Sequence, residues 1–124
     1  HSAYSTPYIT MRNSVLANND TTYGIYVYST GTEASQFDIS YSALYEPDGM
    51  YDSSPNFNYA DNSNLIGDDP AFDSFSQDGD GTNDTLTLDS NSPLIDAGHP
   101  NSAYNDPDGS RNDIGPYGGP EATW

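Results

Sequence analysis

The chain has 124 residues, of which 33% are hydrophobic, and 19 acidic residues against two basic ones give it a net charge of −17. This charge excludes binding to nucleic acid and insertion into an anionic membrane, and it favours divalent cations as ligands. No cysteine is present, which excludes a disulfide scaffold. Asp, Asn, Gly, Ser, Thr and Tyr are abundant and lysine is missing, so we expect an extracellular or cell-surface protein.

The pattern along the chain predicts an all-β domain. After a polar lead-in at residues 1–8, strand-like sequence occupies 9–16, 24–28 and 37–44, where β-branched or aromatic residues recur. A long loop follows, and Leu alternates with Thr at 85–88. Apolar residues do not recur at helical spacing.

Two of these segments resemble one another at an offset of 28 residues. The matched pairs are Ile9 with Phe37, Met11 with Ile39, Ser14 with Ser42, and Leu16 with Leu44. A repeat of this length is typical of a solenoid. Chance similarity between two short strands is the alternative.

Five motifs then extend the comparison: NSVLANN at 13–19, FDISYSAL at 37–44, NLIGDDPAF at 64–72, DTLTLDSNSPLIDAG at 84–98 and NDPDGSRNDIGPYGG at 105–119. In this order they resemble the C-terminal rungs and closing segment of bacterial secreted, surface-anchored right-handed parallel β-helix proteins. The resemblance implies a short right-handed parallel β-helix of about three coils with long loops at residues 9–90. A Gly-, Pro- and Asp-rich cap would follow at 91–124.

About three coils are fewer than such proteins usually contain, and each coil needs neighbours to bury its core. Either further coils precede this sequence or its first coil stacks on another molecule. We therefore expect a non-enzymatic structural or adhesive module that associates with itself head to tail into filaments. The alternatives are a carbohydrate-binding surface module and the C-terminal fragment of a polysaccharide lyase or hydrolase, whose catalytic residues would lie upstream.

Two acidic loops are candidate calcium sites. The first places oxygen ligands at alternate positions around glycines, at Asp78, Asp80, Thr82 and Asp84. A solvated acidic turn is the alternative. The second loop contains Asp106, Asp108 and Asp113, where the simpler interpretation is that Arg111 pairs with a carboxylate.

Surface modification and glycan contacts are also predicted. The sequons at Asn19 and Asn83 are candidate glycosylation sites in expected loops. Tyrosines at 23, 26, 28, 41 and 45 would form a glycan-stacking face, or else pack half-buried against the strands. The adjacent Asp68 and Asp69, followed by Pro70, are expected to form a turn and not a catalytic pair.

Overall fold

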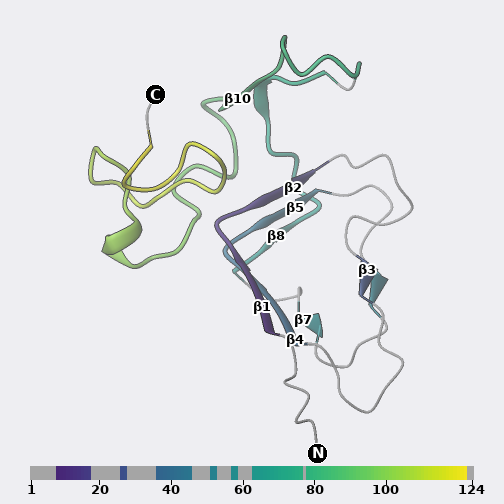
Figure 1. The fold of residues 1–124 in the computed structure, drawn as a ribbon. Coiled ribbons are helices and arrows are strands. Elements are labelled where there is room, and N and C mark those ends of the chain that lie inside the picture. Colours follow the sequence, from purple (N-terminus) through teal and green to yellow (C-terminus); the bar gives the residue numbers. More distant parts are fainter. Residues whose placement is uncertain are drawn as a thin grey trace, which may run out of the picture.

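The computed structural model describes residues 8–17, 26–27, 36–45, 51–52, 57–58, 63–76 and 78–122 (Figure 1). They form ten short strands and one 3₁₀ turn, η1. The strands are β1 (Tyr8–Arg12), β2 (Val15–Ala17), β3 (Tyr26–Val27), β4 (Gln36–Ser40), β5 (Ala43–Tyr45), β6 (Tyr51–Asp52), β7 (Phe57–Asn58), β8 (Leu65–Ile66), β9 (Phe72–Ser74) and β10 (Thr85–Leu88), and η1 is Ser102–Tyr104. No helix among these residues is long and apolar enough to cross a membrane.

The strands are distributed over four small sheets. Two parallel sheets have three strands each, in the orders β1-β4-β7 and β2-β5-β8, and β3 pairs in parallel with β6 alone. Strands β9 and β10 form an antiparallel pair. The expected all-β class is confirmed, but the expected right-handed parallel β-helix is wrong, because separate sheets of two or three strands, one of them antiparallel, replace a continuous solenoid.

Uneven spacing explains why the repeat does not continue. Leu16 lies 28 residues before its strand partner Leu44, but Leu44 lies only 22 residues before its partner Ile66. The third strand of each three-stranded sheet, β7 or β8, is only two residues long. Beyond Ile66 the chain turns at Gly67, whose φ is +82°, and the next two strands pair with each other.

The 28-residue offset is nevertheless a true strand register. Ile9 lies opposite Phe37 and Met11 opposite Ile39 in the first parallel sheet. Leu16 lies opposite Leu44 in the second. The sequence similarity between the two segments therefore reflects parallel pairing and not chance.

A chain of polar groups, most of them buried, connects the bend between β1 and β2, the bend between β4 and β5, and the residue before β8. The Ser14 backbone N–H donates to Ser42 Oγ at 3.3 Å, and the Ser42 N–H donates to Asn64 Oδ1 at 3.0 Å. Ser42 is fully buried, so these bonds satisfy groups that water cannot reach. Asn13 and Tyr41 make the bend in their layers with φ of +50° each, an angle that Asn tolerates better than most residues.

The main apolar cluster joins the second parallel sheet to the C-terminal segment, residues 91–122. Ala43 of β5 packs with Leu94 and Ile114, and all three are completely buried. Val15, Leu65, Leu88 and Ala97 pack around them. Because Val15, Ala43 and Leu65 come from three successive strands, the C-terminal segment lies along the side of the sheet, as Figure 1 also shows.

Two glycines allow the C-terminal segment to fold tightly on itself. A Cβ at Gly98 would lie 2.2 Å from Asn112 Nδ2, and a Cβ at Gly118 would lie 1.9 Å from the Asp113 carbonyl oxygen. No side chain fits at either distance. These close approaches explain why glycine occupies positions 98 and 118.

Candidate binding groove

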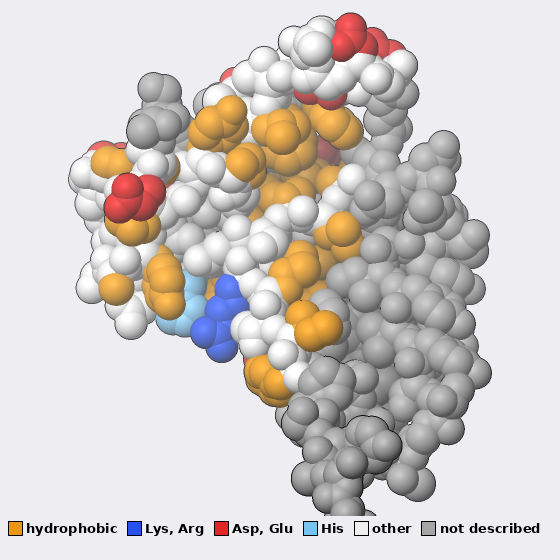
Figure 2. All heavy atoms as spheres, viewed as in Figure 1, with side chains coloured by type: hydrophobic (Ala, Val, Ile, Leu, Met, Phe, Trp, Pro, Cys, Tyr) orange, Lys and Arg blue, Asp and Glu red, His pale blue; other side chains and the backbone are white. Residues whose placement is uncertain are grey.

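An apolar groove lies between the start of the second parallel sheet and the hairpin of β9 and β10. Its volume is about 480 Å³. Its lining residues are all uncharged: Asn13, Ser14, Val15, Ala17, Phe72, Phe75, Leu86, Gly115 and Pro116. Figure 2 shows apolar side chains gathered beneath the hairpin, whose outer end is acidic.

The hairpin supplies one wall of the groove. Phe72 and Phe75 pack edge to face, with ring centroids 5.9 Å apart. Phe75 is still 40% exposed and Leu86 36% exposed, so this wall keeps apolar surface in contact with solvent. Such a surface favours the burial of a further apolar partner.

The floor of the groove follows an edge strand. β2 has β5 on one side and no other described strand on its other side. Asn13, next to β2, is already engaged by the C-terminal segment, because its Oδ1 accepts the His99 N–H at 2.8 Å and its carbonyl accepts the Gly115 N–H at 3.3 Å. Asn13 therefore already has hydrogen-bond partners within the chain. The backbone groups along the edge of β2 remain available to a ligand.

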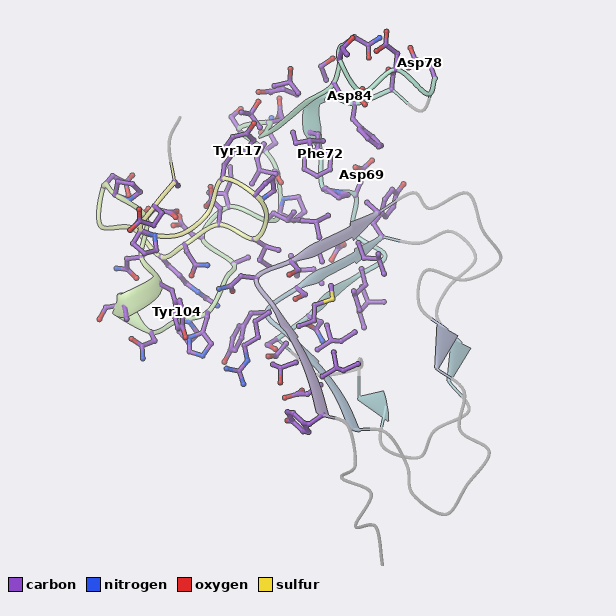
Figure 3. The ribbon with its side chains drawn as sticks, viewed as in Figure 1. Asp69, Phe72, Asp78, Asp84, Tyr104 and Tyr117 are labelled. Atoms are coloured by element: carbon purple, nitrogen blue, oxygen red, sulfur yellow. The ribbon has the colours of Figure 1, made fainter. Side chains whose placement is uncertain are left out.

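The first candidate calcium loop lies at the outer end of the hairpin, where Figure 3 shows Asp78 and Asp84 apart from the three-stranded sheets. Asp78 Oδ1 accepts the Asp80 N–H at 2.9 Å, and Asp80 Oδ1 accepts the Thr82 N–H at 3.1 Å. Asp84 Oδ1 accepts the Ser76 N–H at 2.7 Å. The bond from the Asp80 N–H lowers the pKa of Asp78 below its usual value. The Thr82 hydroxyl, which also donates to Asp80 Oδ1, and then the Thr82 N–H lower the pKa of Asp80.

The second candidate loop uses its carboxylates to fold the C-terminal segment. Asp106 is buried and accepts the N–H groups of Asp113 and Gly119. Asp108 accepts the Ser110 N–H at 2.9 Å. Among the described residues, Arg111 does not pair with a carboxylate as expected: its Nε donates to the Gly98 carbonyl at 2.6 Å.

The two loops lie apart, and within the ranges that the structure covers no three His, Cys, Asp or Glu side chains converge as a metal site would require. The carboxylates instead accept hydrogen bonds from their own loops. Calcium binding therefore stays a prediction for both loops.

The predicted turn at Asp69 is confirmed. Its Oδ1 accepts the Ala71 N–H at 2.9 Å, and Pro70 between them is buried. Ala71 itself has a positive φ of +49°. Asp69 is thus engaged in folding the chain back towards β9.

The structure describes only some of the residues predicted to carry or to bind glycans. Asn83 is exposed, but its Nδ2 donates to Asp78 Oδ2 at 3.1 Å, a bond that a glycan would replace. Asn19, Tyr23 and Tyr28 lie outside the described residues, as do the side chain of Tyr26 and its contacts. Tyr41 is half-buried and packs against the His99 ring with centroids 4.6 Å apart, which favours the packing interpretation for this tyrosine.

Asp113 has the opposite pKa shift from the exposed carboxylates. Partial burial raises its pKa above the usual value of 3.8, and the nearby charges of Asp106, Asp96 and Asp108 raise it further. The folded chain thus keeps this proton at pH values where the unfolded chain has released it. Stability from this group falls as pH rises from 3.8 through the folded-state pKa.

We expect Asp113→Asn to weaken the fall of the free energy of unfolding as pH rises above 3.8. The amide oxygen can still accept the Asp96 N–H, which Asp113 Oδ1 now accepts at 2.8 Å. Urea unfolding across this pH window should show a smaller fall in stability with rising pH than the wild type. Asp108→Asn is the comparison: its pKa is lowered, so its stabilisation is present above 3.8 and is lost as pH falls below that value. Removing it should flatten the rise of stability with pH below 3.8, and it should weaken the fall above 3.8 less than Asp113→Asn does, because the Asp108 charge is only a minor cause of the raised Asp113 pKa.

The groove was not predicted from sequence. The alternating Leu residues at 85–88 correctly indicated a strand. Nothing in the sequence showed that Leu86 would line a groove together with Val15 and Ala17 of β2. Phe72 and Phe75 belong to a short aromatic segment whose partner strand follows ten residues later. Only the pairing of β9 with β10 places these side chains beside Val15.

Comparisons of the chain with family models, with curated proteins and with solved structures each found no match.

Proposed function

We propose that the chain is a non-enzymatic extracellular structural or adhesive module that associates with copies of itself. The observation that carries this proposal is that both three-stranded parallel sheets end at their first strands, with no further strand beyond them among the described residues. β1 and β2 are edge strands of the two sheets, and they are joined by a single short bend at Asn13 and Ser14. An open strand edge is a template for pairing with another chain.

Exposed apolar side chains along the first edge strand support the same proposal. Tyr8 is 61% exposed and Ile9 is 50% exposed, although both lie in a strand. Consecutive residues of a strand point to opposite faces, so the exposure of both leaves apolar surface uncovered on each face of β1. Their exposure is explained if a second molecule covers them.

The net charge opposes this association and makes it dependent on salt. Each chain carries −17, and the acidic groups of two chains repel one another over roughly 10 Å at 0.1 M salt and over greater distances in more dilute solution. We therefore expect association to strengthen with ionic strength, unlike an interface held by ion pairs.

Sedimentation velocity at increasing protein and salt concentrations tests the proposal. The wild type should move to larger species, and electron microscopy should show extended assemblies. Ile9→Lys, which places a charge on the edge of β1, should shift the association to at least tenfold higher protein concentration, since about 1.4 kcal/mol corresponds to tenfold in affinity. Ile95→Lys, at a 38% exposed site of the C-terminal segment, is the matched control. A wild type that stays monomeric at every concentration and salt would contradict the proposal.

We further propose that calcium binds the hairpin loop and stabilises the hairpin. The support is the alternation of oxygen donors at Asp78, Asp80, Thr82 and Asp84, which the local hydrogen bonds already hold in a compact turn. Calcium prefers such oxygen ligands.

Thermal unfolding with calcium or with chelator tests this second proposal. A ligand that binds only the folded chain raises the free energy of unfolding by about 2.7 kcal/mol at a hundredfold excess over Kd, and the thermal midpoint rises with it. The increase should disappear in Asp78→Asn with Asp80→Asn, and should persist in Asp89→Asn, which changes a half-buried carboxylate outside the loop. Equal midpoints for the wild type with and without chelator would exclude calcium.

A further inference from the structure

The edge of β2 points its hydrogen-bonding groups into the groove. The Ala43 N–H donates to the Ser14 carbonyl at 2.9 Å, so this carbonyl points towards β5. A trans peptide directs its C=O and N–H to opposite sides, and the chain has no cis peptide among the described residues. The Val15 N–H therefore points away from β5, towards the open edge.

The other edge of the same sheet is complementary. In β8 the Leu65 N–H donates to the Ser42 carbonyl at 2.9 Å, and the Gly67 N–H donates to the Leu44 carbonyl at 3.0 Å. By the same peptide geometry, the N–H and C=O of Ile66 point away from β5. One end of the sheet thus presents the backbone of Val15 and Ala17, and the other presents the backbone of Ile66.

The side chains show at which end no described strand lies next to the sheet. Leu16, Leu44 and Ile66 occupy one position in three paired strands. Leu44, in the middle, is only 2% exposed, but Ile66, in the last strand, is 49% exposed. A further strand placed beyond β8 would cover Ile66 as β8 covers Leu44.

We propose that the groove holds the edge strand β8 of a second copy of this chain, in parallel with β2. This inference rests on the self-association proposed above and assigns its two surfaces. Leu65 of the second copy lies opposite Val15 and its Ile66 lies opposite Leu16, which continues the register already seen between β5 and β8. The Ala17 N–H donates to the Ile66 carbonyl of the second copy.

The groove matches this occupant in size and in charge. Paired strands lie about 4.8 Å apart, and 480 Å³ accommodates a short strand with its apolar side chains. All nine lining residues are uncharged in a chain of strongly acidic composition, so the contact forms where repulsion is weakest. Phe75 and Leu86 of the hairpin wall would then cover the outer side of the incoming strand.

Complementary variants test the head-to-tail arrangement. Phe75→Asp with Leu86→Asp blocks the groove and leaves β8 intact, and Ile66→Asp blocks β8 and leaves the groove intact. All three sites are exposed, so the variants should stay folded, as circular dichroism checks. Each variant alone should be monomeric by sedimentation, and a mixture of the two should form a 1:1 dimer that grows no further. If the Ile66→Asp variant still assembles alone, β8 is not the occupant.

Disulfide trapping checks the register independently, because the chain has no cysteine of its own. A Leu16→Cys preparation mixed with an Ile66→Cys preparation and oxidised should yield a crosslinked dimer. The reason is that paired residues on neighbouring parallel strands have Cα atoms within the distance of roughly 4.4–6.8 Å that a disulfide spans. Ile95→Cys in place of Ile66→Cys is the control and should crosslink at least tenfold less. Wild-type assembly without selective crosslinking would overturn the inference and leave the proposed self-association standing. A wild type that never assembles would overturn both.

Discussion

Leu94→Ala and Ile114→Ala should each lower the free energy of unfolding by about 2–5 kcal/mol, the usual cost of truncating a large buried aliphatic side chain. Both side chains are completely buried against Ala43, and both belong to a segment with no strand of its own. The loss combines the transfer of apolar surface to water with the cavity left behind. On a chain of this size, it approaches the whole stability expected of a small domain.

Urea or guanidinium unfolding followed by tyrosine fluorescence measures this effect. Ile95→Ala is the matched control, because Ile95 adjoins Leu94 in sequence but is 38% exposed. It should change the midpoint little. If Leu94→Ala behaves like Ile95→Ala, the C-terminal segment does not contribute to the core, and the position of residues 91–122 along the sheet is incorrect.

Asp106→Ala should be the most damaging change of a charged residue in the described part of the chain. Asp106 is 6% exposed and accepts the backbone N–H groups of Asp113 and Gly119. Without the carboxylate both donors lose their acceptor, and each unsatisfied buried donor costs about 1–3 kcal/mol. We therefore expect a loss of roughly 2 kcal/mol or more.

Two companion variants make the result specific. Asp106→Asn keeps one acceptor oxygen and should lose less than Asp106→Ala. Asp108→Ala removes an exposed carboxylate two residues away and should have a much smaller effect. Repeating the series with chelator separates the hydrogen-bonding role from calcium, because the loss in Asp106→Ala should persist. A loss that disappears with chelator would show that Asp106 acts as a metal ligand and not as a backbone acceptor.

The register of β1 with β4 and of β2 with β5 could be predicted from the sequence because the two segments repeat the same short pattern of apolar residues. Ile9 and Leu16 repeat as Phe37 and Leu44, and parallel strands place equivalent residues side by side, so one offset sets the pairs between β1 and β4 and between β2 and β5. The turn at Asp69 was predictable for the same reason, since an Asp-Pro pair and the following N–H form a local unit. Calcium at Asp78 and Asp80 was also inferred locally and stays a prediction.

The sequence by itself determined an acidic all-β chain, the pairing of its first two long strands and the Gly-rich nature of its C-terminal segment. It did not determine how many strands each sheet would hold, because the third strands are too short to show a pattern. The groove, too, was decided by tertiary structure. Val15, Phe72 and Gly115 are more than 40 residues apart along the chain. Two tertiary features bring the walls of the groove together: the pairing of β9 with β10, and the packing of Val15 and Leu88 against the fully buried Ala43, Leu94 and Ile114. Long-range contacts of this kind depend on shape and volume, which a local pattern does not encode.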